Sequence, residues 1–358
     1  MKGETGSVTP RGRELSDPVV CIDAGQTGMR AELRANGTAA PQGSQTRQNQ
    51  QNLQTRQSQL TRVTVARAEL PGIVAGAPVL PQLTPLVNDL LDRYAALGAP
   101  AGSVRIVCAG VSGLDRSESA EEWLGELAGV GIRSVHAAHD SISSYLGALG
   151  QAPGAVVASG TGAVTVALGE RNVVRVDGWG SLLGDFGSAY WMGREGLSLV
   201  LRSYDGRAEQ TALTPIVTAD FPDLSTMYTE LQKDPRHVAR IASYSKVVAD
   251  LADSHADEAC ARIASQAGEL LAESVNAGLA RTGQQAERAP HIGMVGKVFD
   301  SITVRRAFTD AVMQQHPEAQ FVRADGRGLD GAERLATLPA SSPLAQDVLV
   351  ASVARGAA

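Results

Sequence analysis

Short apolar runs alternate with segments of helical apolar spacing along most of the chain. A continuous apolar run between turn residues favours a buried strand, whereas apolar residues repeated at three- and four-residue intervals favour a helix facing a core. The pattern predicts strands at residues 19–23, 104–108, 134–137, 155–158 and 292–295, and helices at residues 83–97, 119–128, 142–149, 188–202 and 245–281. Strands that alternate with helices are typical of an α/β fold.

A polar, glutamine-rich tract interrupts this pattern at residues 38–61. It has too little apolar surface to offset the entropy lost on ordering, so we expect a flexible insertion in a hairpin whose strands cover residues 28–34 and 62–68. Its arginines could instead contact a partner. Residues 1–18 are also polar and predict a disordered leader. They lack the apolar region of a signal peptide, which predicts a cytoplasmic protein.

Two segments of the chain have the same form. Residues 20–28 read as an apolar strand, a glycine–threonine turn and a second strand, and residues 156–163 repeat that order. This repeat predicts a duplicated domain, with an N-terminal copy over residues 19–149, a C-terminal copy over 150–330 and a cleft between them. Residues 331–358 are expected to form a C-terminal helix that packs back on the N-terminal domain.

The composition of the chain argues against several classes of function. The chain has 358 residues, of which 43% are hydrophobic, enough for about two domains with sizeable cores. Its formal charge of −6 argues against a broad surface for nucleic acid or an anionic membrane. The three cysteines form no C-x-x-C pair, which argues against a disulfide scaffold, a four-cysteine zinc site or a self-contained iron–sulfur site.

The turn Asp23-Ala24-Gly25-Gln26-Thr27-Gly28 is suited to phosphate. Glycines let backbone N–H groups approach phosphate oxygens, and the Thr27 hydroxyl can donate to them. Asp23 can hold the water shell of Mg²⁺. The alternative is an ordinary hairpin turn.

A second glycine–threonine turn, Gly160-Thr161-Gly162, offers another phosphate clamp with the same alternative. Neither turn is a Walker A loop, and residues 293–297 lack both its spacing and its final Ser or Thr.

Asp140 follows a predicted strand and precedes an apolar helix. The carboxylate could be a general base for a substrate hydroxyl, or it could simply cap the helix. His136 and His139 lie nearby, but zinc would need a further ligand.

Residues 177–193 are rich in glycine and contain two of the three tryptophans. Such a segment fits a pocket loop that leads into a helix, in which Asp185 accepts sugar hydroxyls and an aromatic ring stacks on the sugar. A buried turn with tryptophan in the core is the alternative.

Taken in order, these segments resemble the BadF/BadG-type ATPase family, and within it the N-acetylglucosamine kinases of the actin/hexokinase superfamily. The resemblance covers roughly residues 19–340 and is most specific in the run from Gly178 to Trp191. It implies an α/β fold of two similar actin/ribonuclease H-like domains, each a mixed sheet flanked by helices, around a nucleotide cleft.

The resemblance also implies roles for individual residues. It places phosphate or ATP at Asp23, Gly25, Gln26, Thr27, Gly160, Thr161, Gly162 and Gly296. It makes Asp140 the base for a sugar 6-hydroxyl and places the sugar at Ser112, Gly113, Asp140, Thr161, Trp179, Gly180 and Asp185. The implied activity is ATP- and Mg²⁺-dependent phosphorylation of an amino sugar, in a homodimer.

Two departures bear on the substrate. Phe186 stands where the family pattern has Glu, and residues 70–77 lack the Asn with which related kinases hold the sugar. Two other functions stay open: an ATPase that activates an acyl-CoA dehydratase through an iron–sulfur cluster held by paired cysteines, and a sugar or nucleotide sensor without catalysis.

Overall fold

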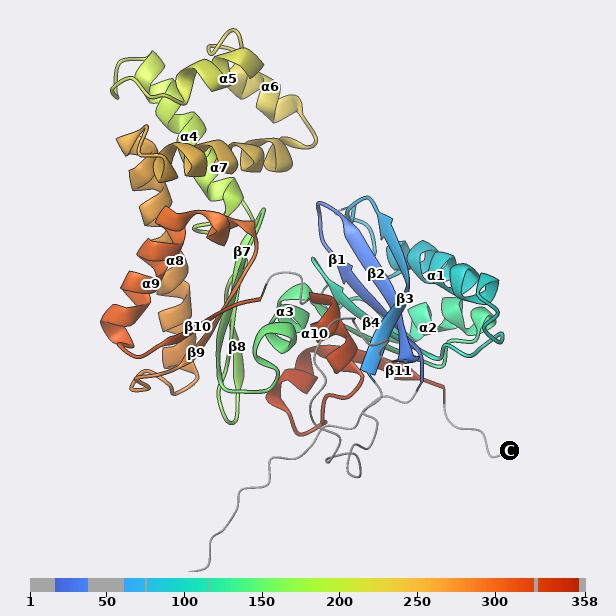
Figure 1. Ribbon diagram of the computed structural model, residues 1–358. Coiled ribbons are helices and arrows are strands. Elements are labelled where there is room, and N and C mark those ends of the chain that lie inside the picture. Colours follow the sequence, from blue (N-terminus) through green and yellow to red (C-terminus); the bar gives the residue numbers. More distant parts are fainter. Residues whose placement is uncertain (1–16, 38–60, 75, 115, 325–327, 354–358) are drawn as a thin grey trace, which may run out of the picture. The chain divides into compact units, whose positions relative to one another are not determined.

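The computed structural model describes residues 17–37, 61–74, 76–114, 116–324 and 328–353 (Figure 1). The predicted leader and the predicted glutamine-rich insertion therefore lie outside the described residues, except for residues 17, 18 and 61. The chain divides into two compact units. Unit 1 comprises Met1–Ser143, Ala332–Ser341 and Asp347–Ala358, and unit 2 comprises Ser144–Gly331 and Ser342–Gln346.

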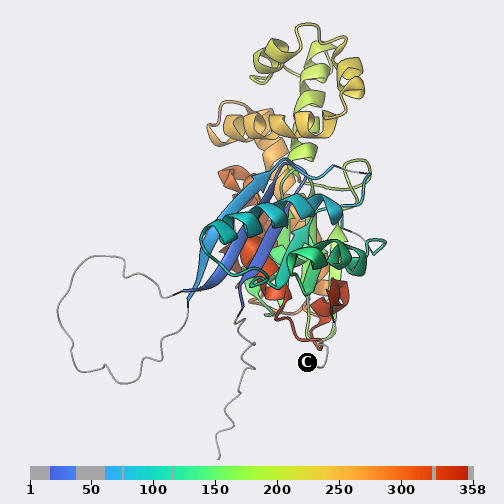
Figure 2. The ribbon, with the colours of Figure 1, turned by 90° about the vertical axis from the view of Figure 1, so that its right-hand side faces the viewer.

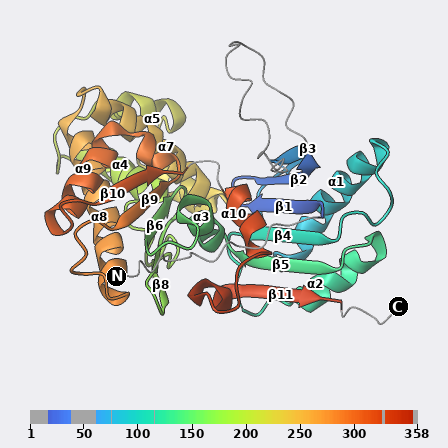
Figure 3. The ribbon, with the colours of Figure 1, turned by 60° about the horizontal axis from the view of Figure 1, so that its bottom comes forward.

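Unit 1 is built on a six-stranded mixed sheet. Its strands are β1 (Val19–Ala24), β2 (Met29–Gly37), β3 (Thr61–Leu70), β4 (Ile106–Val111), β5 (Ser134–His139) and β11 (Val348–Ser352). They lie in the order β11-β5-β4-β1-β2-β3, which Figure 3 shows as a ladder. The strands β1, β4 and β5 are parallel, and the other neighbours are antiparallel. The expected hairpin is confirmed, because β2 pairs with β3.

Two helices cover one face of this sheet (Figure 2). They are α1 (Thr84–Ala96) and α2 (Ala120–Leu127), with the 3-10 turns η1 (Pro81–Leu83) and η2 (Ala128–Val130) beside them. Side chains of β1 such as Ile22 form one core with Leu86, Leu90 and Trp123 of the helices. Burial of this continuous apolar face accounts for the apolar runs in the central strands.

Unit 2 repeats the same plan. Its sheet contains β6 (Gly154–Ser159), β7 (Ala163–Leu168), β8 (Val173–Asp177), β9 (His291–Val295) and β10 (Gln320–Arg323), in the order β10-β9-β6-β7-β8. As in unit 1, the first strand pairs antiparallel with the next and parallel with a strand from later in the chain. The shared strand order and directions confirm the repeat inferred from the two glycine–threonine turns.

The helices of unit 2 pack on that sheet and extend beyond it (Figure 1). They are α4 (Ala189–Tyr204), α5 (Thr214–Asp220), α6 (Met227–Lys233), α7 (His237–Asp253), α8 (Glu258–Arg281) and α9 (Ile302–Gln315), with the turn η3 (Lys297–Asp300). Helices α8 and α9 lie side by side. The helix α3 (Asp140–Leu149) begins in unit 1, and the division between the units falls within it, at Ser143.

The single helix expected over residues 245–281 is wrong, because the structure has two helices there. Helix α7 ends at Asp253, His255 has a φ of 56°, and α8 begins after Asp257. The Asp257 carboxylate accepts hydrogen bonds from the Cys260 N–H at 2.9 Å and from the Thr211 hydroxyl at 2.6 Å. An aspartate that caps a helix start and also binds a distant loop favours a break that apolar periodicity cannot reveal.

The expectation of a C-terminal helix over residues 331–358 is corrected in part. Helix α10 (Gly328–Leu335) ends early, the turn η4 (Pro343–Asp347) follows, and the chain then forms β11 at the edge of the unit 1 sheet. Glu333 fastens this segment to unit 1 through ion pairs with Arg34 at 3.0 Å and Arg62 at 2.7 Å. No helix among the described residues has the length and apolar character needed to span a membrane.

Candidate active site

The first glycine–threonine turn joins β1 to β2 in unit 1. The Gly25 N–H donates to the Gly28 carbonyl oxygen at 3.0 Å and closes the turn. Gln26 and Thr27 are exposed at its tip. This exposure is what a phosphate clamp needs, since its donors must reach a ligand from solvent.

Two neighbouring loops hold this turn in place. The Ile73 N–H donates to the Gly25 carbonyl oxygen at 3.0 Å, and the Ser112 N–H donates to the Ala24 carbonyl oxygen at 2.8 Å. A Cβ atom on Gly72 would lie 2.0 Å from the Gln26 carbonyl oxygen. The loop after β3 therefore passes so close to the turn that only glycine fits at position 72.

Replacing Gly72 by Ala is expected to displace the Gln26 peptide and to raise the KM for ATP about tenfold, because the added methyl group overlaps backbone atoms that cannot rotate away. Gly129→Ala is the matched control, since a Cβ atom there meets nothing within 4 Å. Steady-state kinetics on both variants checks this. Equal KM values for the two variants would show that the turn does not position ATP.

Asp23 lies near the end of β1 and forms an ion pair with Arg30 of β2 at 2.6 Å. Burial raises the pKa of the Asp23 carboxyl, Arg30 opposes that shift, and the charge of Asp140 adds to it. Among the described residues, no group of three or more His, Cys, Asp or Glu side chains could hold a metal ion. One carboxylate still fits Mg²⁺ that arrives with ATP, because this ion keeps several waters and needs only one or two protein carboxylates.

Asp140 is the first residue of α3, directly after β5. Its side chain is 32% exposed, so a substrate can reach the carboxylate. The alternative that Asp140 caps the helix is wrong. His139 caps it instead, because its Nδ1 accepts the Ser141 N–H at 3.2 Å. The Asp140 carboxylate is therefore not used to cap α3.

The two histidines of β5 do not form a zinc site. His136 and His139 are three residues apart on one strand and so point to opposite faces of the sheet. The His136 ring is paired at Nε2 with the Ser134 hydroxyl at 2.9 Å. Burial lowers its pKa, which favours the neutral ring.

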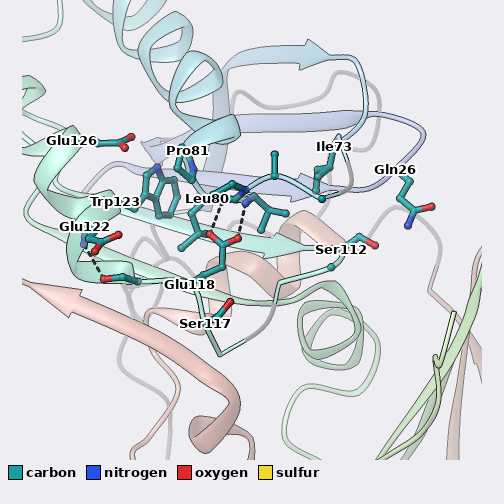
Figure 4. Close-up of a pocket in the computed structure, with 16 residues that line it drawn as sticks. Gln26, Ile73, Leu80, Pro81, Ser112, Ser117, Glu118, Glu122, Trp123 and Glu126 are labelled. Atoms are coloured by element: carbon teal, nitrogen blue, oxygen red, sulfur yellow. Dashed lines mark hydrogen bonds between the residues drawn. The ribbon is translucent and has the colours of Figure 1, made fainter. Parts of the chain in front are cut away.

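A cavity of about 510 Å³ opens beside the first glycine–threonine turn, within unit 1 (Figure 4). Three of the predicted site residues, Gln26, Ser112 and Gly113, line it. Sequence reasoning missed the rest of the wall, which consists of Ile73, residues 76–81 and 117–119, Glu122, Trp123 and Glu126. The segment that lacks the family Asn therefore lines the cavity, and its contribution there is largely apolar.

Glu118 shapes this cavity. Its carboxylate accepts the Val79 N–H at 2.6 Å and the Leu80 N–H at 3.3 Å (Figure 4). Because backbone donors occupy both oxygens, Glu118 holds the loop after β3 against the loop after β4. Glu118 does not directly follow a predicted strand or a glycine turn, so no sequence pattern indicated this role.

In unit 2, the second turn connects β6 to β7 and lies against the start of α4. The Gly160 N–H donates to the Gly162 carbonyl oxygen at 2.9 Å. The Ala189 and Tyr190 N–H groups donate to the carbonyl oxygens of Gly160 and Thr161, at 2.9 and 3.1 Å. The start of α4 thus fixes the turn, just as loop donors fix its counterpart in unit 1.

The glycine-rich segment brings Asp185 onto this turn. A Cβ atom on Gly162 would lie 2.6 Å from Asp185 Oδ2, and the Asp185 side chain is buried. Burial raises the pKa of the Asp185 carboxyl, while the Ala163 N–H opposes the shift and the nearby Asp177 charge adds to it. Asp185, Thr161 and Gly162 are therefore assembled within unit 2, as the prediction requires of a sugar and phosphate site.

Asp177 holds that segment in shape, a role that sequence reasoning missed. Its two carboxylate oxygens accept the Asp185 N–H and the Phe186 N–H, each at 2.9 Å. Asp177 and Asp185 have positive φ angles of 59° and 58°. Two non-glycine residues in this region indicate backbone strain that the surrounding hydrogen bonds maintain.

Large apolar side chains of the same segment face solvent. Trp179 is 69% exposed, and Arg175 lies over its ring at 5.7 Å from the centroid. Phe186, the departure from the family Glu, is also exposed. The alternative that Trp179 is a core residue is therefore wrong, whereas Trp191 is buried in the core of unit 2.

Gly296 follows β9 and touches the strand that leads into the second turn. Its φ is 102°, and a Cβ atom there would lie 2.1 Å from the Ser159 carbonyl oxygen. The candidate residues thus form two groups. Asp23, Gly25, Gln26, Thr27, Ser112, Gly113 and Asp140 lie in unit 1, and Gly160, Thr161, Gly162, Trp179, Gly180, Asp185 and Gly296 lie in unit 2.

Comparison with models of protein families shows to which family the chain belongs. The model of the BadF/BadG/BcrA/BcrD ATPase family matches residues 25–333. The chain belongs to this family. The match includes residues 25–28 of the first turn, the whole second turn, Asp140 and the glycine-rich segment 177–193.

Two curated proteins are related to this member of the BadF/BadG/BcrA/BcrD family. The N-acetyl-D-glucosamine kinase of Dictyostelium discoideum is 27% identical over 247 residues, which are 65% of this chain and 76% of the relative. The N-acetylmuramic acid/N-acetylglucosamine kinase of Clostridium acetobutylicum is 29% identical over 128 residues, 35% of this chain and 41% of that relative.

Solved structures support the fold. Two bacterial proteins provisionally assigned as N-acetylglucosamine kinases cover 89% of this chain, and the alignments span 98% of each of them. The protein from Chromobacterium violaceum has a TM-score of 0.62 at 24% identity, and that from Porphyromonas gingivalis has 0.59 at 16%. The α/β fold of two similar domains is therefore confirmed.

The three cysteines of this family member test the alternative function, an ATPase that activates an acyl-CoA dehydratase through an iron–sulfur cluster. Cys21 and Cys108, far apart in the sequence, are neighbours in register on β1 and β4, which the sequence did not reveal. All three cysteines are fully buried and free. Burial raises the pKa of the Cys21 and Cys108 thiols and that of Cys260, the last to about 12. Buried, protonated thiols do not suit a cluster shared between subunits.

Proposed function

We propose that this protein is an ATP-dependent sugar kinase that phosphorylates the 6-hydroxyl of an amino sugar such as N-acetylglucosamine or glucosamine. The observation that supports this most is the assembly of Asp185, Thr161 and Gly162 in unit 2, because it joins a phosphate turn to a buried hydroxyl acceptor. The names of both curated relatives support the same chemistry.

The two glycine–threonine turns would bind the phosphates of ATP, and Gly296 would lie on the adenosine side. Main-chain hydrogen bonds fix each turn within its own unit, so the donors of the turn need little reorganisation during the reaction. Donors fixed in this way stabilise the charge that develops on the transferred phosphoryl group.

Asp140 would act as the general base. As the sugar 6-oxygen attacks the γ-phosphorus, the hydroxyl proton moves to the Asp140 carboxylate, and the bond between the γ-phosphorus and the β,γ-bridging oxygen breaks to release ADP. The exposure of the Asp140 side chain and its place at the start of α3 support this role.

Mg²⁺ would be held by the ATP phosphates and, through water, by Asp23. When bound, it neutralises phosphate charge and so lowers the barrier to nucleophilic attack. The ion pair between Asp23 and Arg30 leaves the second carboxylate oxygen for such a water.

Ser112 and Gly113 are the candidate sugar residues of unit 1, and Thr161, Trp179, Gly180 and Asp185 are those of unit 2. The loop after β3 gives the cavity an apolar wall, and residues 70–77 lack the Asn that the family resemblance implies. This supports a substrate with a hydroxyl pattern or substituent other than the one that such an Asn would bind. The homodimer and the cytoplasmic location stay predictions.

A substrate panel tests the proposal. Purified protein with Mg-ATP is offered N-acetylglucosamine, glucosamine, N-acetylmuramic acid and glucose, and ADP release is coupled to a spectrophotometric readout. We expect at least one amino sugar to stimulate ADP release over the sugar-free rate by about a hundredfold or more. Unchanged ADP release with every sugar would refute the kinase, and tight sugar binding without turnover would favour the sensor.

A further inference from the structure

The guanidinium of Arg175 binds the start of the glycine-rich segment. Arg175 lies in β8, and its carbonyl oxygen accepts a hydrogen bond from Arg281 Nη1 at 3.1 Å, which ties its backbone to the end of α8. Its Nε donates to the Asp177 carbonyl oxygen at 3.3 Å, and its Nη2 donates to the Gly178 carbonyl oxygen. The planar guanidinium therefore holds the two residues that precede Trp179.

The same guanidinium lies over the ring of Trp179, with Cζ 5.7 Å from the ring centroid. A cation in this position is attracted by the electrons of the aromatic face, and Arg is the side chain that most often takes it. One guanidinium covers one face of the ring, and the Trp179 side chain is mostly exposed. The other face of the ring is therefore accessible to a ligand.

Gly184 keeps the base of the Trp179 side chain next to Asp185. A Cβ atom on Gly184 would lie 2.8 Å from the Trp179 Cβ atom and 2.4 Å from Asp177 Oδ1, so the backbone at Gly184 packs against both side chains. Asp177 in turn accepts the Asp185 N–H at 2.9 Å. The exposed aromatic ring and the buried carboxylate thus share one set of supporting contacts within unit 2.

We propose that Arg175 is a positioning residue, which holds the Trp179 ring as a stacking surface for the sugar next to Asp185. This inference rests on the proposed function of the glycine-rich segment. The C–H groups on a face of a pyranose are apolar and suit an aromatic ring, whereas the hydroxyls suit a carboxylate. A ring that Arg175 already holds loses little side-chain entropy when the sugar binds, so Arg175 favours binding without touching the sugar.

Steady-state kinetics of Arg175→Met tests the proposal, because Met lacks the charge and the hydrogen-bond donors of Arg. We expect the KM for the amino sugar to rise about tenfold, with kcat and the KM for ATP changed by less than about twofold, since stacking is equal in the ground state and the transition state. Arg171→Met is the matched control. Arg171 is exposed between β7 and β8, so this variant should keep every wild-type parameter.

Trp179→Ala shows whether Arg175 acts through the ring. Ala keeps the Cβ atom that packs against Gly184 and removes only the indole. Trp179→Ala should raise the KM for the sugar at least as much as Arg175→Met, and the double variant should raise it no further, because the two side chains act as a unit. A KM for the sugar within about twofold of wild type in Arg175→Met, or losses that add in the double variant, would overturn the proposal.

Fluorescence without turnover separates this inference from the proposed function. Trp123 and Trp191 are buried, so acrylamide quenches chiefly Trp179. Without ATP, a saturating amino sugar should lower the quenching constant of the wild type by about twofold and leave that of Trp179→Ala unchanged. Quenching that is indifferent to every sugar would overturn the inference.

The two measurements together distinguish the two failures. Protection of Trp179 by an amino sugar that stimulates no ADP release would refute the kinase and leave the stacking surface in place. Sugar-stimulated ADP release with an unaltered KM for the sugar in Arg175→Met and Trp179→Ala would refute the stacking surface and leave the kinase in place.

Discussion

Replacing Asp140 by Asn is expected to lower kcat for sugar phosphorylation by about three orders of magnitude, with the KM values for ATP and sugar changed by less than about threefold. The amide keeps the size and hydrogen-bonding capacity of the carboxylate but cannot accept a proton. The variant therefore still binds ATP and sugar as the wild type does, and it loses only the proton transfer. Initial rates over a matrix of ATP and sugar concentrations separate the two parameters.

Asp89→Asn is the matched control for this variant. Asp89 lies in the same unit and forms an exposed ion pair with Arg93 on α1, so the same change of one charge should leave kcat unaltered. Should Asp140→Asn retain more than about a tenth of the wild-type kcat, Asp140 would not be the base, and another carboxylate would have to be sought.

Gly296→Ala is expected to destabilise unit 2 by about 3–5 kcal/mol and to abolish measurable ATP saturation. The added Cβ atom would lie 2.1 Å from the Ser159 carbonyl oxygen, and the φ of 102° is one that an alanine adopts only under strain. Because Ser159 leads directly into Gly160, relief of the clash would move the second phosphate turn. Chemical unfolding and the dependence of the rate on ATP concentration measure the two effects.

Gly283→Ala separates the clash from the backbone strain. Its φ is 82°, but a Cβ atom there meets nothing within 4 Å. We expect a loss of only about 1–2 kcal/mol and an unchanged KM for ATP. Equal losses of stability in the two variants would mean that the close approach to Ser159 contributes nothing, and that Gly296 is needed for its dihedral angle alone.

Local patterns were sufficient for most of the inner strands and their helices. Apolar runs located β1, β4, β5, β6 and β9, because strands buried on both faces need continuous apolar sequence. The edge strands β8, β10 and β11 were missed because each has only four or five residues, too few for a periodic pattern. The break at Asp257 was missed for another reason, namely that its partner Thr211 is distant in the sequence.

The candidate site was predictable wherever the chemistry is local to one turn. Both glycine–threonine turns, Asp140 and Asp185 could be recognised because a few consecutive residues carry the signal. The supporting residues could not be recognised in this way. Asp177 acts through two backbone N–H groups, and Glu118 acts on a loop some forty residues earlier in the chain.

The sequence by itself determined that the chain has two copies of a strand–turn–strand unit with glycine and threonine at the turn, since backbone sterics and apolar periodicity act over a few residues. Only the tertiary structure decided which backbone atoms lie against those turns, namely Gly72 beside Gln26 and Gly296 beside Ser159. Close approaches of this kind depend on how loops from separate strands meet at one end of a sheet. A linear pattern of residue types carries no record of such distances.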